Sequence, residues 1–357
     1  MSMPTVAIVG GSARAAAGSA LRAGWSPWCI DLFADSDLRA MAPVTRIPFA
    51  DYPQRIPQLL KDAPPGPVIY TGGLENHPRI IEQIAAEREV WGNSAATVRQ
   101  VRDPFVVATL FQANRIECPQ LSKVREAGDY LKKPLRGAGG LNIAIATPDE
   151  PSPAGYYFQQ FIPGPAYAAV YFANEDRCYL LGVTEQIVGE PALNAKPFHY
   201  AGSIGPVPLS FRAESTLKRI GEVLYANVGM RGVFGVDFIL NDNQVWPVEV
   251  NPRYTASIEV VERATGIAAF TLDRFAFPTQ PLLWGKAILF ASRRVVVRQD
   301  FLKFLDAADV PAPGEIIEAN WPILTLFTSG ANSAECRQAL FNRAREIFTL
   351  VEADSPA

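Results

Sequence analysis

Three polar residues within residues 233–257 have the types and the spacing of a metal site. Asp237 ends one apolar segment, and Glu249 and Asn251 lie two residues apart in the next. Successive side chains of a strand alternate between its faces, so Glu249 and Asn251 point to the same side. Carboxylate and amide oxygens suit Mg²⁺, which completes its octahedral shell with water and phosphate oxygens. We predict that these three residues bind Mg²⁺, with Mn²⁺ as an alternative.

The elements that must position these residues are predicted to form a β-hairpin. Asn241–Asn243 favours a turn, because short Asx side chains tolerate left-handed backbone. A surface hairpin with scattered polar residues would explain the turn. It would not explain why Glu249 and Asn251 share one face of an apolar strand, where unpaired charge is costly. The other face is expected to consist of the alternating apolar residues Trp246, Val248 and Val250.

A lysine followed by a glycine-rich turn lies about a hundred residues upstream of this hairpin. Tyr130–Pro134 is predicted to be a strand that carries Lys133, and Leu135–Gly140 follows it as a turn. Glycines let backbone N–H groups approach phosphate oxygens, and a lysine supplies a point charge. We therefore predict a nucleotide-phosphate site formed by Lys133, Gly137, Ala138, Gly139 and Gly140.

The run Glu249-Val250-Asn251-Pro252-Arg253 resembles the metal-binding signature of the ATP-grasp superfamily, closest to that of carbamoyl phosphate synthetase. Residues 232–257 resemble a group of predicted ATP-grasp carboxylate–amine ligases that includes the tyramine–glutamate ligase of methanofuran biosynthesis. This resemblance implies an ATP-grasp fold, ATP and Mg²⁺ as cofactors, and an acyl-phosphate intermediate. It also implies that Arg253 is catalytic, stabilising the transferring phosphoryl group or the tetrahedral intermediate.

The segment Tyr156–Ile162 is similar to the strand that becomes the hinge between the two nucleotide-clamping lobes of this family. The family often carries a phosphate-binding lysine just after an aspartate, but this chain has Pro104 there, and Arg102 is the candidate replacement. The acid that holds the ribose in many relatives is also missing from Pro165–Ala169. The adenine-binding residues implied by the resemblance are Gln159, Gln160, Phe161 and Ile162.

Composition bounds the class of protein. The 357 residues favour two or three domains, and a hydrophobic content of 48% with 19% charged residues supports folded cores. The net charge of −3 lacks the basic footprint of proteins that bind nucleic acid or anionic membranes. No apolar run has the length of a transmembrane helix, and the N-terminus has no signal-peptide pattern. We expect a cytoplasmic protein with neither nucleic-acid nor membrane partners.

The predicted fold class combines α/β and α+β architecture. Strands that alternate with helices predict a small parallel α/β domain for residues 1–94. Residues 95–277 are expected to form the ATP-grasp nucleotide-binding domain, with a single helix at Val98–Gln112 and a glycine-rich lid around residues 118–162. Residues 278–357 are predicted to form a small β-rich α+β region. This region weakly resembles the one that closes the site and contacts the dimer partner in biotin-carboxylase-like relatives, so we expect a homodimer.

Three functions remain open. The first is an ADP-forming carboxylate–amine ligase with small-molecule substrates, in methanofuran or tetrahydromethanopterin biosynthesis by analogy. The second is a biotin-carboxylase-like enzyme that phosphorylates bicarbonate or a carboxylate. It is disfavoured because Ser257 falls near the position of the glutamate base, with Glu259 slightly beyond. The third is an ATP-binding regulatory protein with reduced catalysis, motivated by Pro104 and by the lack of acids in the hinge.

Two further residues have more than one interpretation. His199 lies in a loop of small residues that looks like the substrate-side loop of the predicted ligases, but a histidine merely hydrogen-bonded in a surface loop fits equally well. Arg231 lies shortly before Asp237, where a phosphate contact could arise, and a surface ion pair is an equal alternative. The sequence leaves the substrates, the pathway and the oligomeric state open.

Overall fold

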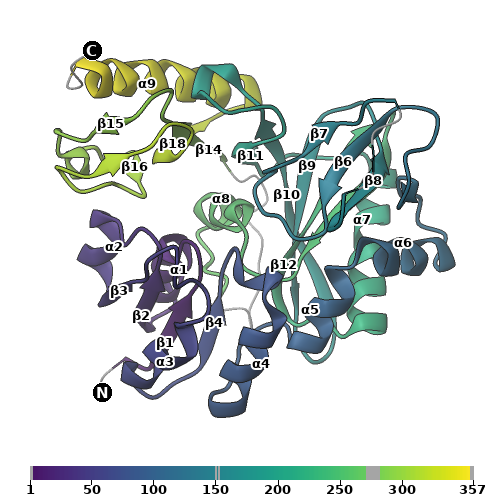
Figure 1. Ribbon diagram of the computed structural model, residues 1–357, viewed down its shortest axis with the longest axis horizontal. Helices are drawn as coiled ribbons and strands as arrows, with labels where there is room; N and C mark the ends of the chain where they lie inside the picture. The colour runs from purple at the N-terminus through teal and green to yellow at the C-terminus, as the bar shows by residue number, and fades with distance from the viewer. Residues whose placement is uncertain (1–2, 149–150, 152, 271–281, 354–357) are drawn as a thin grey trace.

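The computed structural model describes residues 3–148, 151, 153–270 and 282–353, and for residues 352 and 353 only the helical backbone. Within these residues the strands form four sheets (Figure 1). Figure 1 shows the N-terminal layer at the lower left, the long helix of the C-terminal segment at the top, and a small separate sheet at the right. Four short 3₁₀ helices lie at Leu60–Asp62, Leu74–Asn76, Pro191–Leu193 and Phe301–Lys303.

The N-terminal sheet has four parallel strands in the order β3-β2-β1-β4. Its strands are β1 (Thr5–Val9), β2 (Ser26–Asp31), β3 (Val44–Arg46) and β4 (Val68–Tyr70), and its helices are α1 (Arg14–Arg22), α2 (Ser36–Met41), α3 (Ile56–Leu59) and α4 (Pro78–Glu87). Because the strands run in one direction, Asp31 at the end of β2 and Thr71 after β4 lie at the same carboxyl-terminal edge, where parallel sheets place binding sites.

The largest sheet has eight strands in the order β13-β12-β9-β10-β11-β14-β18-β16, and all of its neighbours are antiparallel. The boundary predicted after residue 277 lies in 271–281, outside the described residues. A strand before it, Tyr200–Gly205, and a strand after it, Leu283–Phe290, are hydrogen-bonded neighbours in this sheet. The strands are β9 (Ala166–Ala173), β10 (Cys178–Val188), β11 (Tyr200–Gly205), β12 (Gly232–Asn241), β13 (Gln244–Asn251), β14 (Leu283–Phe290), β16 (Ala307–Ala308) and β18 (Pro322–Gly330).

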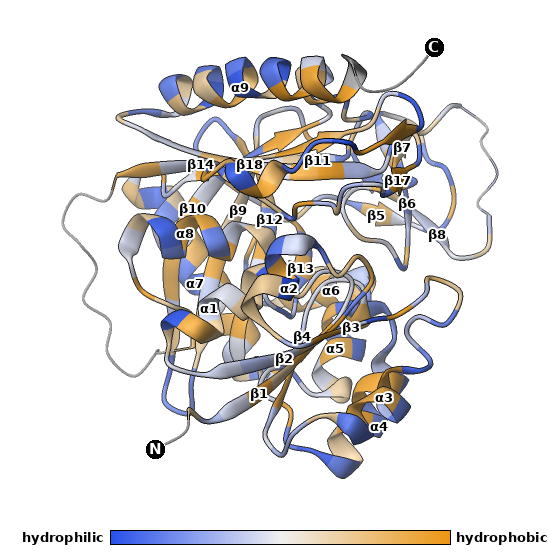
Figure 2. Ribbon diagram, turned by 90° about the vertical axis from the view of Figure 1, so that its left-hand side faces the viewer, coloured by the Kyte–Doolittle hydropathy of each residue, from blue (hydrophilic) through white to orange (hydrophobic). Residues whose placement is uncertain are grey.

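Three helices pack on this sheet: α7 (Phe211–Val228), α8 (Ala256–Thr265) and α9 (Ser333–Ala353). Helix α9, at the top of Figure 2, alternates hydrophobic and hydrophilic stretches, as an amphipathic helix does. Its buried residues recur every three or four positions, at Cys336, Leu340, Ala344, Ile347 and Val351. A separate pair of short strands, β15 (Val295–Val296) and β17 (Ile316–Ile317), completes the C-terminal segment.

The lid is a small antiparallel sheet in the order β5-β8-β6-β7. Its strands are β5 (Leu121–Ser122), β6 (Tyr130–Pro134), β7 (Ala144–Ile145) and β8 (Tyr156–Gln160). Its own buried core consists of Tyr130, Ala146 and Phe158. So small a core supplies little stability by itself, and the lid depends on contacts with the rest of the chain.

The single helix predicted for Val98–Gln112 is wrong, because the chain forms two helices, α5 (Ala95–Val101) and α6 (Pro104–Ala113). Asp103 between them is extended, with φ −90° and ψ 108°, and its carboxylate accepts hydrogen bonds from the N–H groups that follow Pro104. A proline ring disfavours helical backbone at the preceding residue, and an aspartate satisfies the first free N–H groups of a new helix.

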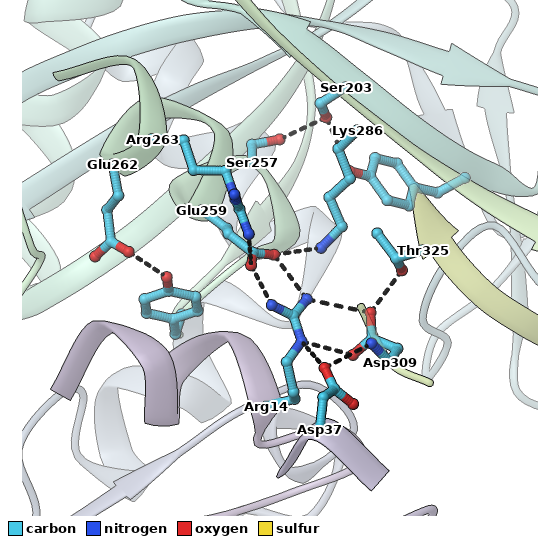
Figure 3. A network of polar contacts seen from close by, with 12 residues as sticks. Arg14, Asp37, Ser203, Ser257, Glu259, Glu262, Arg263, Lys286, Asp309 and Thr325 are labelled. Carbon is cyan, nitrogen blue, oxygen red and sulfur yellow. Dashed lines mark hydrogen bonds and ion pairs between the residues drawn. The ribbon is translucent and has the colours of Figure 1, made fainter. Parts of the chain in front are cut away.

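A buried network of charges joins the N-terminal layer to the large sheet (Figure 3). Arg14 of α1 donates hydrogen bonds to both carboxylate oxygens of Glu259 of α8, with Nη2 2.9 Å from Oε2, and its Nε lies 2.9 Å from Asp309 Oδ1. Lys286 Nζ of β14 lies 2.8 Å from Glu259 Oε2. Burial favours a raised pKa for Glu259, but Arg14 and Lys286 outweigh it and hold this pKa well below its usual range.

Glu259→Gln should lower the free energy of unfolding by about 3 kcal/mol, since it leaves two buried cations without their shared carboxylate. Urea unfolding measures this loss. The matched control is Glu82→Gln, which removes an exposed pair with Arg99 and should cost less than about 1 kcal/mol. Because the pKa of Glu259 is depressed on folding, its contribution is full near neutral pH and declines below roughly pH 4.3. An equal loss in both variants would contradict this prediction.

Candidate functional site

A cleft of about 530 Å³ lies between the lid sheet and the β12–β13 end of the large sheet. It brings together most of the residues that the sequence singled out, from elements far apart in the chain. These are Lys133, Gly139, Gly140, Gln159, Gln160, Phe161, Ile162, Asp237, Glu249, Asn251 and Arg253. Gly137 and Ala138 line a smaller adjoining cavity of about 70 Å³, which shares Lys133, Gln159 and Glu249 with the cleft.

Asp237 and Glu249 lie directly opposite each other on the adjacent strands β12 and β13. Asn251 Nδ2 donates a hydrogen bond to Asp237 Oδ2 at 2.9 Å, and Gln186 Nε2 donates to the other oxygen at 2.9 Å. Burial, followed by repulsion from Glu249, raises the pKa of Asp237 to about 7. A divalent cation between the two carboxylates would relieve this repulsion, so the two acids and the Asn251 amide oxygen fit Mg²⁺.

The hairpin contains a bulge that the sequence pattern did not predict. Asp237 pairs with Glu249, but the next residue, Phe238, pairs with Pro247, so Val248 is the extra residue on β13. The expected alternation of Trp246, Val248 and Val250 is therefore wrong: Val250 is buried in the core, whereas Val248 lines the cleft next to Glu249. A bulge bends its strand and re-aims side chains, which is frequent beside binding sites.

Arg102, the candidate for the missing lysine, reaches both the cleft carboxylates and the lid. Its Nη1 lies 2.5 Å from Glu249 Oε1, and its Nη2 donates to the carbonyl oxygen of Gly137 at 2.9 Å. Burial would raise the pKa of Glu249, but Arg102 and Lys133 lower it below its usual value. Pro104 occupies the position at which the family often has a lysine. Arg102, two residues earlier, already places a positive charge at the cleft.

The glycine-rich turn is held against two other segments. Asn76 Nδ2 donates to the Gly137 carbonyl at 3.2 Å, and the Tyr200 N–H donates to the Gly139 carbonyl at 3.1 Å. Lys133 is buried and its Nζ donates to Gln159 Oε1 at 3.0 Å. The lid is therefore closed over the cleft, with its lysine oriented by a residue of the expected hinge.

Arg253 connects the cleft to the N-terminal layer. Its Nε lies 2.6 Å from Oε1 of the buried Glu75, and its Nη2 donates weakly to Asn251 Oδ1 at 3.4 Å. Three buried oxygens around it, Thr71 Oγ1, Glu75 Oε2 and Thr255 Oγ1, have no hydrogen-bond partner among the described residues. Buried polar atoms without a partner are costly, so these three atoms suggest that a ligand or water completes the site.

Sequence reasoning missed Gln186, which organises the cleft and whose polar side chain interrupts the apolar strand β10. Glu75, which also organises the cleft, ends the segment Gly72–Glu75 after β4, which the sequence offered as the lining of a substrate crevice. Two other acids, Glu185 and Glu190, also line the cleft, and Glu185 Oε1 lies 2.6 Å from an arginine of α9. Glu185 and Glu190 line the same cleft as the expected hinge residues Gln160 and Ile162. The sequence showed no acid in Pro165–Ala169, the segment that holds the ribose in many relatives.

His199 and Arg231 lie apart from these groups. The ring of His199 packs 6.2 Å from that of Phe290, and it lines a different surface hollow. The Arg231 guanidinium lies 5.0 Å above the ring of Tyr225, and its Nη1 donates to a backbone carbonyl. Both side chains are therefore explained by local packing.

Comparison with known proteins places this geometry in a family. Residues 101–257 match the family model described as an ATP-grasp domain. This stretch, which is less than half of the chain, is therefore similar to an ATP-grasp domain. An uncharacterized protein of Methanocaldococcus jannaschii is 23% identical over 263 residues, covering 66% of this chain and 63% of that relative. The chain therefore spans less than two thirds of this relative's length.

Solved structures share the whole architecture. The L-amino acid ligase from Bacillus licheniformis matches with a TM-score of 0.72 at 15% identity, covering 97% of this chain and 98% of that one. The biotin carboxylase domain of the 2-oxoglutarate carboxylase from Hydrogenobacter thermophilus matches with a TM-score of 0.72 at 13% identity, covering 95% and 89%. At such identities the similarity shows the fold, and it confirms the predicted ATP-grasp fold with its parallel N-terminal layer and small C-terminal β region. Within the described part of the chain, none of the helices combines the length and the apolar character needed to span a bilayer.

Gly140→Ala should loosen the lid of the ATP-grasp domain. A Cβ at Gly140 would lie 1.8 Å from the Phe198 carbonyl oxygen, which forces the turn away from its neighbour. The matched control is Gly139→Ala, because Gly139 also has a positive φ but has nothing within 4 Å of its Cβ position. Hydrogen exchange of the amides of residues 137–144 should accelerate roughly tenfold or more in the first variant only. Equal acceleration in both variants would assign the effect to backbone strain.

Proposed function

We propose that the chain is an ADP-forming ligase that joins a carboxylate to an amine through an acyl phosphate. The observation that carries this proposal is the opposed pair Asp237 and Glu249, enclosed by Lys133 and the closed glycine turn and flanked by Arg253. Phosphoryl transfer requires positioning and charge neutralisation more than covalent participation of the protein. The cleft provides fixed cations, backbone N–H groups and a pair of metal-binding acids in one enclosed space.

Each residue has a separate task in this proposal. Asp237, Glu249 and Asn251 would hold Mg²⁺, which neutralises phosphate charge when bound. Lys133 and the amides of residues 137–140 would hold phosphate oxygens, and the hinge from Gln159 to Ile162 would bind the adenine edge. Arg253 would stabilise charge that develops on the transferring phosphoryl group or on the tetrahedral intermediate, because it is fixed beforehand by Glu75.

Two observations weigh against the alternatives. A bicarbonate-phosphorylating enzyme of the biotin carboxylase type would need a glutamate base near residue 257. Ser257 is hydrogen-bonded to Thr184 and Ser203, and Glu259 is held by Arg14 and Lys286. A regulatory protein without catalysis was motivated by the missing lysine at Pro104, and the nearby Arg102 supplies a cation at the cleft.

The finer parts of the proposal rest on resemblance. The L-amino acid ligase among the structural neighbours supports an amino acid or a related amine as one substrate. The group that includes the tyramine–glutamate ligase suggests a role in the synthesis of a one-carbon cofactor, methanofuran or tetrahydromethanopterin. We also propose a cytoplasmic homodimer that acts on small molecules. An ADP-release assay over a panel of carboxylates and amines tests the reaction class, and ADP formation that requires bicarbonate instead would replace it.

Glu249→Gln should reduce ATP turnover at least a hundredfold while the protein remains folded, because one of the two metal-binding carboxylates is lost. Turnover is measured as ADP release with Mg²⁺, and chelation of the metal should have the same effect on the wild-type protein. Glu214→Gln, which removes an exposed carboxylate of α7, should leave turnover unchanged. Full activity of Glu249→Gln would refute the metal assignment.

A further inference from the structure

A second pocket of about 270 Å³ lies between the N-terminal sheet and the C-terminal strands of the large sheet. Arg253, Thr255 and Ala256 line both this pocket and the nucleotide cleft. A molecule bound here would therefore meet the cleft at Arg253. Thr71 and Thr255, whose hydroxyl groups have no partner among the described residues, lie at this junction and are free to bind it.

The charges around this second pocket do not suit an anion. Its four basic lining residues all belong to ion pairs, so a ligand carboxylate would have to displace an internal partner. The pairs are Arg14 and Lys286 with Glu259, Arg46 with Glu315, and Arg253 with Glu75. Figure 3 shows the pairs of Arg14 and Lys286. The pairs of Arg14, Lys286 and Arg253 are buried or partly buried, and breaking such a pair by removing one partner is strongly destabilising. The pair of Arg46 with Glu315 is exposed and carries no such cost.

One acid of the pocket remains uncompensated. Asp35 lines the pocket and is only 9% exposed, yet its carboxyl group has no hydrogen bond or ion pair among the described residues. It does not cap the helix that follows it. Burial, followed by repulsion from Asp309, Asp31, Asp37 and Glu315, raises the pKa of Asp35 to about 9. With this pKa the carboxyl group is protonated near neutral pH, and a cation brought beside Asp35 would lower the pKa and favour the carboxylate.

Another part of the pocket lining is apolar and partly aromatic. Phe33 and Trp321 pack edge to face, with ring centroids 6.4 Å apart, and Ile288, Ile316 and Leu324 continue this wall. Trp321 keeps 41% of its surface exposed, so part of its side chain can still contact a ligand. A carboxylate next to aromatic rings is a recurring way of binding organic cations, and the apolar surface holds the body of the molecule.

We propose that this pocket binds a primary ammonium group carried on a small apolar body, with Asp35 accepting its hydrogen bonds. A primary ammonium suits the site because Asp35 offers acceptors that a quaternary ammonium could not use. The identification of this molecule as the amine substrate rests on the proposed ligase function. Binding itself does not, since the pocket is complete without nucleotide.

Calorimetric titration of the full chain, without nucleotide, tests the proposal with three probes that share the 3-methylbutyl group. The probes are 3-methylbutylamine, the anion 4-methylpentanoate and the neutral 3-methylbutan-1-ol. We expect the amine to bind at least tenfold more tightly than the other two. Failure of the amine to bind at millimolar concentration, or equal affinity for the acid or the alcohol, would overturn the proposal.

Variants locate the binding. Asp35→Asn should weaken amine binding roughly tenfold to a hundredfold, because an amide of equal size cannot become the carboxylate that the ammonium group favours. Asp176→Asn, an exposed position in the β9–β10 turn, is the matched control and should bind as the wild type does. Trp321→Ala should also weaken binding and provides a second measure should Asp35→Asn fold poorly. Unchanged affinity in both Asp35→Asn and Trp321→Ala would exclude this pocket.

The same variants separate this inference from the ligase proposal. If the amine binds and depends on Asp35 but never stimulates ADP release with any carboxylate, the pocket stands and the ligase proposal falls. If amines stimulate ADP release and Asp35→Asn leaves the KM for the amine unchanged, the ligase stands and this inference falls.

Discussion

The site depends on two carboxylates, Asp237 and Glu249, that lie opposite each other in a partly dry cleft. Like charges at such short range are unfavourable unless other groups compensate them. The compensating groups come from distant parts of the chain: Gln186 from β10, Arg102 from the end of α5, and Asn251 from the same hairpin. The cleft therefore forms only when these segments come together. The lid takes part because Arg102 also donates a hydrogen bond to its glycine-rich turn.

The network around Glu259 performs a comparable task without facing the nucleotide cleft. It links α1, α8 and β14 through buried ion pairs, which orient the N-terminal layer on the large sheet. Buried pairs of this kind add little net stability relative to apolar packing, but losing one partner is costly. The two groups of charges thus specify the relative placement of segments. Arg253 lies between them and contacts Glu75 of the N-terminal layer.

Local sequence patterns predicted elements well and contacts between distant elements poorly. Strand β6 was predicted at its observed residues, because the glycine-rich turn that follows Pro134 marks its end in the local sequence. The bulge at Val248 was not predictable from the alternation of side chains. Pro104 was interpreted as the loss of a phosphate-binding lysine, and its tendency to end a helix was overlooked. The network of Arg14, Glu259, Lys286 and Asp309 escaped notice because Arg14 and Asp309 are 295 residues apart. The residues from Glu249 to Arg253 occupy five consecutive positions at the end of β13, so local sequence sufficed to predict that Glu249, Asn251 and Arg253 lie near one another.

The continuous eight-stranded sheet has a mechanical consequence. Since β11 and β14 are hydrogen-bonded to each other, the central and C-terminal strands behave as one rigid body. Among the described residues, the lid sheet shares no strand pairing with that body. The lid sheet can move away from the cleft once a few contacts break, such as those of Gly137 with Arg102 and Asn76. Small molecules can then enter and leave the nucleotide cleft. The second pocket beside Asp35, which is formed by the large sheet and the N-terminal layer, keeps its shape meanwhile.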